Sequence, residues 1–164
     1  MSEERIGDTV EDQLERAGKS VNDLLESARR RIWVHTRSRL LTALPEVALP
    51  SAMSRVARRT RHADLRLLID DDLSLKSEHP RLTHTVTRLT TAIEVRCLAP
   101  AQDTPASLLL VVDRTAWLYL VQHKGQVGLK AERRDPAGNR TAAERFAEAW
   151  AISSESLELR KLLL

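Results

Sequence analysis

The sequence has few glycines and a single cysteine, and both shortages exclude whole classes of protein. Five glycines in 164 residues form no Gly-x-Gly-x-x-Gly or Walker pattern, so a glycine-rich phosphate cradle is not expected. Because Cys97 is the one cysteine, the chain cannot form an internal disulfide or a cysteine metal cluster. The apolar run IEVRCL around Cys97 predicts a small, buried and unreactive thiol.

Long apolar runs and an apolar amino terminus are also missing. No run approaches the roughly 18 residues that a membrane span requires, so no transmembrane segment is expected. The first residues, MSEERIGDTVEDQLERAG, are acidic, whereas a secretory signal begins basic and continues apolar. These features predict a cytoplasmic protein. With 42% apolar and 30% charged residues, residues 1–164 are expected to form one folded domain.

Charge is divided unevenly along the chain. Residues 1–28 contain eight acidic side chains against three basic ones, whereas residues 29–66 contain ten arginines against Glu46 and Asp64. Such a basic stretch suits contact with an anionic partner, but a helix with an apolar inner face and a solvated arginine face gives the same count. Both interpretations stay open. The candidate residues for binding an anionic ligand are Arg37, Arg39, Arg55, Arg58, Arg59 and Arg61.

Periodicity predicts an N-terminal amphipathic helix within residues 1–30. Apolar residues recur at steps of three and four from Val10 to Ala28, which places them on one stripe of a helix. Asp8 and Glu11 fit a capping box at its start. The three arginines Arg29–Arg31 suit its last turn, because cations are favoured at the negative end of the helix dipole.

The rest of the chain alternates short apolar runs with helical patterns. Further helices are expected to begin at a cap on Ser51, near Pro80, and at a capping box of Thr141 and Glu144. The polar stretch after residue 121 is expected to be a loop with one edge strand. Strands are predicted over residues 32–36, 65–69, 93–97, 107–112 and 117–121. This order indicates an α/β fold, a mixed β-sheet flanked by helices.

The part of the chain from residue 63 onward resembles one half of a phospholipase D-like fold. The similar segments are the strand LRLLIDD, the helix HPRLTHTVTRL, the strand IEVRCL, the paired strands SLLLVVDRTAWLYLV and the closing AERFAEAWAISSESLELRKLLL. In these segments the chain resembles an uncharacterised bacterial family of small, single-half members of that fold. The resemblance implies a single phospholipase D-like half, and the first helix and the strand IWVHT fit the same topology.

Enzymes of that superfamily carry a His-x-Lys motif, followed after four residues by Asp and later by a Gly-Ser-x-Asn stretch. The histidine attacks phosphorus and the lysine holds the phosphate charge, so neither has an easy substitute. When Asp113 is placed on the motif's aspartate, the histidine position is Ala106 and the lysine position is Leu108. The resemblance therefore implies the fold without the activity. Asp113 is then interpreted as a turn residue.

Three consecutive acids, Asp70, Asp71 and Asp72, follow the strand predicted over residues 65–69. Ligands in open α/β sheets bind beyond the carboxyl ends of the strands, and clustered carboxylates can hold Mg²⁺. Asp70 and Asp72 are therefore the metal ligands of an alternative hypothesis. The other interpretation of the three acids is a solvated loop that caps a following turn. The five histidines show no metal-ligand spacing.

The first functional hypothesis is a catalytically inactive pseudoenzyme, without a cofactor, that binds protein or an anionic ligand such as nucleic acid or lipid headgroups. The second is a metal-dependent phosphohydrolase or nuclease, and the third is a structural subunit of a larger complex. Stacking of single-stranded nucleic acid is not expected, because all five aromatic residues are predicted to be buried.

A homodimer is expected, because the resemblance implies that a single half finds its second half by self-association. The tail SLELRKLLL and the strand around Leu118 and Leu120 offer apolar surface for it.

Overall fold

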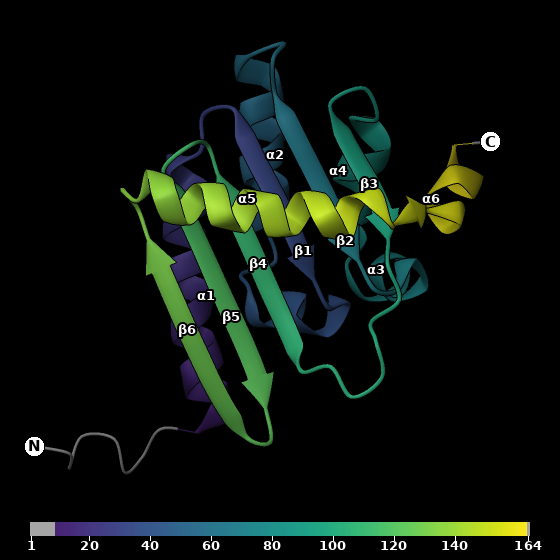
Figure 1. The fold of residues 1–164 in the computed structure, drawn as a ribbon. Helices are drawn as coiled ribbons and strands as arrows, with labels where there is room; N and C mark the ends of the chain where they lie inside the picture. Colours follow the sequence, from purple (N-terminus) through teal and green to yellow (C-terminus); the bar gives the residue numbers. More distant parts are fainter. Residues whose placement is uncertain (1–8, 164) are drawn as a thin grey trace, which may run out of the picture.

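The computed structural model describes residues 9–163 and shows one seven-stranded mixed sheet between two layers of helices (Figure 1). The strand order is β6-β5-β4-β1-β2-β3-β7. Strands β1, β2 and β3 run parallel, and β4, β5 and β6 continue the sheet in antiparallel pairs. The strands are β1 Arg31–Thr36, β2 Asp64–Ile69, β3 Ile93–Cys97, β4 Ala106–Val112, β5 Ala116–His123, β6 Gln126–Glu132 and β7 Ser154–Glu155. This is the expected α/β fold with a mixed sheet.

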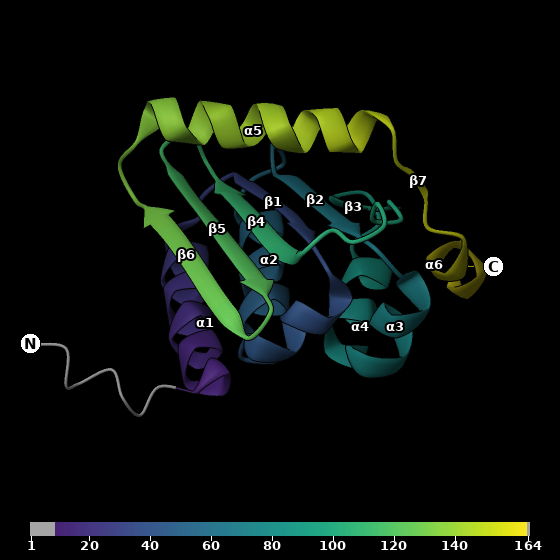
Figure 2. The ribbon, with the colours of Figure 1, turned by 60° about the horizontal axis from the view of Figure 1, so that its bottom comes forward.

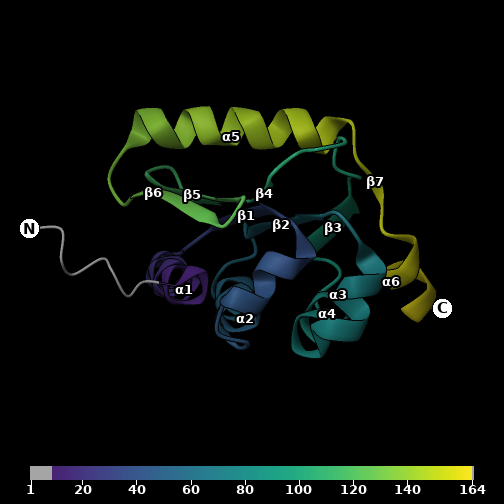
Figure 3. The same cartoon turned by 90° about the horizontal axis from the view of Figure 1, so that it is seen from below.

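The helices divide unequally between the two faces of the sheet. Helices α1, α2, α3 and α4 lie on one face, and α5 alone crosses the other, as Figures 2 and 3 show. A short 3₁₀ segment, η2, follows β1, and α6 lies beside the β3 edge. Their bounds are α1 Val10–Ser27, η2 Ser38–Ala43, α2 Ala48–Arg59, α3 Asp72–Glu78, α4 Pro80–Arg88, α5 Pro136–Ala151 and α6 Leu157–Leu162. No helix within residues 9–163 combines the length and apolar character that crossing a bilayer requires.

Alternation along the strands supplies a core on each face of the sheet. Ile32 and Val34 of β1 face the larger core under the four helices, and Trp33 between them faces the smaller core under α5. Because both faces are covered, β4 is apolar almost throughout, as buried strands are. The aromatic side chains are less buried than expected. Trp33 and Phe146 are buried, whereas Trp117, Tyr119 and Trp150 are half-buried.

The N-terminal helix is confirmed, but both of its predicted ends are wrong. Its capping box consists of Thr9 and Asp12, and Asp8 lies outside the described residues. The helix ends at Ser27, so Arg29–Arg31 do not form its last turn. The cation at this end comes instead from Arg55 of α2, whose guanidinium donates to the carbonyl oxygens of Leu25, Glu26 and Ala28. A contact from another element thus replaces the predicted local one.

Two later helices begin earlier than predicted, each with a proline in its first turn. Helix α2 starts at Ala48 and includes Pro50, so Ser51 is not its cap. Helix α5 starts at Pro136 behind Asp135, whose side chain accepts the Gly138 N–H, so Thr141 is not its cap. Proline is tolerated in the first turn because its nitrogen would have no intrahelical partner there. Helix α3 was not predicted.

The C-terminal leucines are only partly packed. Leu159 is buried, whereas Leu157 is 64%, Leu162 45% and Leu163 55% exposed. Leu118 and Leu120, expected to offer apolar surface to a second copy, are both 0% exposed. That part of the dimer prediction is wrong, because β5 is an inner strand covered on this face by the larger core.

Candidate anion-binding surfaces

The two positions that the resemblance assigns to the catalytic histidine and lysine lie in the protein core. Ala106 and Leu108, at the start of β4, are 2% and 0% exposed and belong to the larger core. Asp113 follows the other end of β4, in the β4–β5 turn, with a φ of 50°. It is a turn residue, as predicted. Its carboxylate also accepts hydrogen bonds from the backbone N–H groups of Arg29, Arg30 and Arg31, the last two at 2.9 Å. No pattern in the sequence predicts this long-range contact.

Each of the three consecutive acids serves a different element. Asp70 accepts the Ser38 N–H at 2.8 Å, and Asp71 caps α3. Asp72 accepts the Ser156 hydroxyl at 2.9 Å and the Glu158 N–H at 3.1 Å, at the start of α6. Over residues 9–163, no group of three or more histidine, cysteine or acidic side chains comes together as metal ligands would. The arrangement is that of capping residues, because Asp70 and Asp72 accept hydrogen bonds from different elements.

One further titratable pair lies at the carboxyl ends of β1 and β2. His35 is half-buried, and burial lowers its pKa, while the negative charge of Asp70 opposes that shift. His35 is therefore neutral at pH 7. Sequence reasoning missed this pair, and the available signal was that the two residues end consecutive predicted strands.

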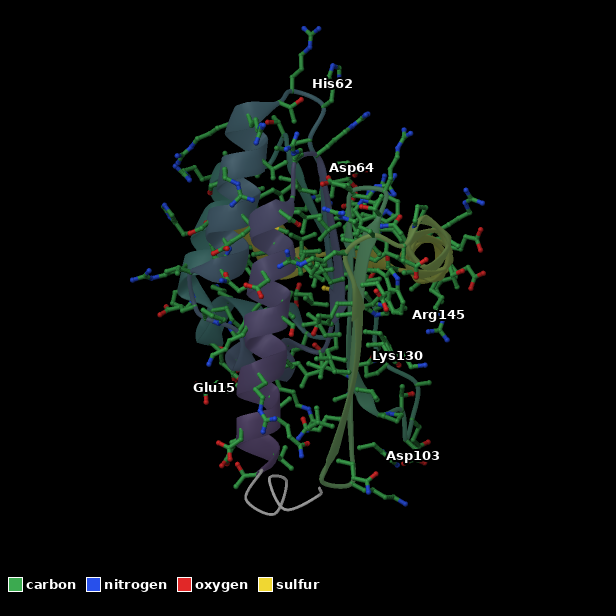
Figure 4. All side chains as sticks on the ribbon, turned by 90° about the vertical axis from the view of Figure 1, so that its left-hand side faces the viewer. Glu15, His62, Asp64, Asp103, Lys130 and Arg145 are labelled. Carbon is green, nitrogen blue, oxygen red and sulfur yellow. The ribbon has the colours of Figure 1, made fainter. Side chains whose placement is uncertain are left out.

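The structure does not bring the six predicted arginines together. Arg37 and Arg39 follow β1 at the carboxyl ends of the parallel strands. Arg55, Arg58 and Arg59 belong to α2, and Arg61 lies between α2 and the start of β2. Figure 4 shows the sheet from its edge, with Asp64 at one end and Asp103 of the β3–β4 loop at the other.

Two of the six arginines make structural hydrogen bonds. Arg37 donates to the Thr104 carbonyl at 2.8 Å, and Arg55 donates to the carbonyl oxygens at the end of α1. The guanidinium donors of both are therefore at least partly occupied within the fold.

A basic groove lies between α2 and α4. Its volume is about 890 Å³, and Val47 and Pro50 are among the residues that line it. Arg58 and Arg59 of α2 and Arg81 of α4 line it, and no acidic side chain does. Arg81 pairs with Glu46 at 3.5 Å, but both side chains are largely exposed, and such pairs are weak. The groove thus has apolar area and cationic walls.

A second basic surface lies where β1 and β2 begin. Burial is the main cause that lowers the pKa of Arg31. The negative charge of Asp64 opposes this shift, and the positive charges of Arg114, Arg66 and Arg30 add to it. The guanidinium groups of Arg30, Arg66 and Arg114 therefore lie close enough to Arg31 to repel it. We call Arg30, Arg31, Arg66 and Arg114 the arginine row. None of its members belongs to the predicted set. Arg30 directly precedes β1, Arg31 and Arg66 lie in strands, and Arg114 lies in a turn.

The comparison with protein families gives a clear match. The model of the family described as "Domain of unknown function (DUF7931)" matches residues 13–162. The chain belongs to this family. No curated protein matches it.

Three solved structures show the same fold at low sequence identity. The archaeal chromatin protein TrmBL2, described as showing a novel mode of DNA binding, is 13% identical with a TM-score of 0.64. The match covers 87% of this chain and 52% of that chain, so this chain spans about half its length. Nuc from Salmonella typhimurium, a phospholipase D family member, is 14% identical with a TM-score of 0.53, over 83% of this chain and 88% of that chain.

NucT from Helicobacter pylori is 12% identical with a TM-score of 0.53, over 91% of this chain and 96% of that chain. At such identities the three likenesses show the fold alone. They confirm that this α/β fold resembles that of phospholipase D family members.

Proposed function

We propose that this chain is a non-catalytic phospholipase D-like module that binds an anionic ligand in the groove between α2 and α4. The observation that carries the proposal is the lining of that groove by Arg58, Arg59 and Arg81 without an acidic side chain. Guanidinium groups bind carboxylates and phosphates through paired N–H donors. The absence of catalysis is supported by Ala106 and Leu108, which are packed where a nucleophile and a phosphate clamp would be needed.

The groove favours a ligand that combines a negative charge with an apolar part. Val47 is 46% exposed at its edge, and Pro50 contributes further apolar area. Most ligand sites are apolar with a few placed polar groups that fix orientation. An alkyl phosphate, which has the chemistry of a lipid headgroup and the start of its chain, therefore suits this groove better than inorganic phosphate does.

The test is a titration of the full chain with hexyl phosphate, followed by amide chemical shifts. We expect shifts concentrated on α2 and α4, and weaker binding of both inorganic phosphate and hexanol. Arg58→Gln with Arg59→Gln should weaken binding at least tenfold, because hydrogen bonds to charged groups contribute about 1.5–3 kcal/mol each. Arg37→Gln with Arg39→Gln, at the far end of the sheet, is the matched control. Equal affinity of the two double variants would overturn the proposal.

Catalysis is tested separately. No phosphodiester hydrolysis is expected, with or without Mg²⁺. Metal-dependent turnover that Asp70→Asn abolishes would instead support the phosphohydrolase hypothesis.

Self-association is a separate proposal and rests on the exposed leucines of α6 and the residue after it. Leu157, Leu162 and Leu163 leave apolar area in water that a second copy would cover. Light scattering decides it: a mass near the 18.5 kDa of one chain at micromolar concentration would contradict the dimer.

A further inference from the structure

The arginine row comes from segments that lie side by side at one end of the sheet. Arg114 belongs to the turn between β4 and β5, Arg30 and Arg31 lie at the start of β1, and Arg66 lies in β2. The strand order places β4, β1 and β2 next to one another. Neighbouring strands are about 4.8 Å apart, so the row extends over roughly 10 Å along the end of the sheet.

Two acids at this end, Asp64 and Asp113, make contacts within the fold, and the four arginines of the row outnumber them. Asp64 pairs with Arg66 at 3.0 Å, and both side chains are about one third exposed. Asp113 directs its carboxylate to three backbone N–H groups. Within residues 9–163, no hydrogen bond or ion pair reaches the guanidinium groups of Arg31 and Arg114. The row therefore has an excess of unpaired N–H donors.

Aromatic rings hold part of the row in a fixed orientation. The guanidinium of Arg31 lies 4.2 Å and that of Arg66 4.7 Å from the centre of the Trp33 ring. Phe146 stacks on the same ring, 5.0 Å from centre to centre. A guanidinium over a ring face keeps its N–H donors in its own plane, where they remain free to bind an anion. The stacking fixes two guanidinium groups without using their donors.

Trp33 itself has an unsatisfied hydrogen-bond donor. Its side chain is 8% exposed, and its Nε1–H has no hydrogen-bond partner in the described structure. Buried indole groups usually find an acceptor.

We propose that the arginine row binds the phosphate backbone of nucleic acid without reading its sequence. The row is a line along the end of a sheet, which suits a polymer with repeated phosphates better than one small anion. Phosphates along one strand of a duplex advance about 3.4 Å per residue, so about four of them span the roughly 10 Å of the row. The guanidinium groups of Arg31 and Arg66 cover the Trp33 ring, so this ring is not available to stack on bases. We therefore expect the row to contact phosphates, which duplex DNA presents without unpairing. This site does not depend on the groove between α2 and α4.

The test measures the affinity of the full chain for a 20-base-pair duplex of mixed sequence by fluorescence polarisation between 50 and 200 mM salt. Four phosphate contacts give a slope of log K against log salt of about −3.6, which is a loss of about 150-fold over this range. Arg30→Gln with Arg114→Gln should reduce the slope to about −1.8 and the loss to about 12-fold. Both side chains are exposed, so the fold should tolerate these changes.

Arg58→Gln with Arg59→Gln is the matched control, because it removes the same charge from the groove. It should leave the slope unchanged. An unchanged slope in the Arg30 and Arg114 variant, or a reduced slope in the control alone, would overturn the proposal. The same holds if the wild type shows no binding at 50 mM salt. Failure of the groove proposal is seen separately, in the hexyl phosphate titration.

Discussion

Replacing Leu108 by lysine tests whether this position, to which the resemblance assigns the catalytic lysine, lies in the protein core. Leu108 is 0% exposed, and buried lysines have a pKa 3–5 units below the usual 10.4, at roughly 5–7. The folded protein then has to hold lysine uncharged at pH 7. With about 1.36 kcal/mol per unit between pH 7 and pH 10.4, the cost is roughly 5 kcal/mol. This approaches the whole stability of many domains, about 5–15 kcal/mol.

The pH dependence of the Leu108→Lys variant has a definite sign. Because the lysine pKa is lowered in the folded state, the unfolded state binds more protons between the two pKa values. The stability of the variant should therefore rise with pH, by about 1.4 kcal/mol per unit, until the pH approaches 10.4. Urea unfolding followed by circular dichroism at pH 7, 8 and 9 measures both the loss and its slope.

Two control variants separate charge burial from loss of packing. Leu108→Met keeps the volume and should cost less than about 1.5 kcal/mol. Ser107→Lys places the same charge one residue earlier, on the half-buried side of β4, and should have little effect and no such pH slope. If Leu108→Lys matched Leu108→Met in stability at every pH, the side chain at this position would reach solvent. The reasoning that a phosphate clamp has no room there would then fail.

Three further predictions follow from single contacts. Gly18→Ala should lower the melting temperature, because the added Cβ would lie 2.5 Å from the Ala43 carbonyl oxygen; a rise, as alanine gives in an open helix, would contradict the packing of α1. Burial raises the pKa of the Cys97 thiol to about 11, so a disulfide reagent at pH 8 should label it slowly until urea unfolds the chain. Fast labelling of the folded protein would refute this. Asn139→Ala should cost about 1–3 kcal/mol in urea unfolding, because its buried amide donates to the carbonyls of Val112, Asp113 and Ala116, and a neutral result would show that water replaces it.

The strands could be predicted because their pattern is local. Alternation in β3 and the apolar runs of β2 and β4 are visible within six or seven residues. Each predicted strand agrees with the structure to within about two residues at its ends, and the edge strand after residue 121 is β6. The mixed sheet followed from the order of these elements. The fold class can therefore be predicted from short-range periodicity in the sequence.

The helix ends could not be predicted in the same way, because distant residues set them. Helix α1 ends against Arg55 of α2 and is followed by backbone held by Asp113. Helix α6 begins against Asp72, more than eighty residues earlier in the chain. A prediction from the sequence pairs each charged residue with a neighbour in the sequence. It therefore places Arg29–Arg31 in the last turn of α1, which ends at Ser27.

The candidate site shows the same limit. The predicted arginines were chosen for their closeness in sequence, and the structure spreads them over both ends of the sheet. Arg31, Arg66 and Arg114 come together only because β1 lies between β4 and β2. That adjacency depends on the order of the strands in the sheet, which was not predicted from the sequence.

Unoccupied donors, and not the number of arginines, distinguish the proposed binding surface from a structural contact in this chain. The guanidinium of Arg55 donates to three carbonyl oxygens at the end of α1 and so stabilises the fold. Arg31 lies on an indole ring whose own N–H has no acceptor, beside Arg114, which has no partner within the described residues. Folding alone gains little from holding such cations together, since like charges repel. An anion that binds there would gain the donors that the fold leaves unused.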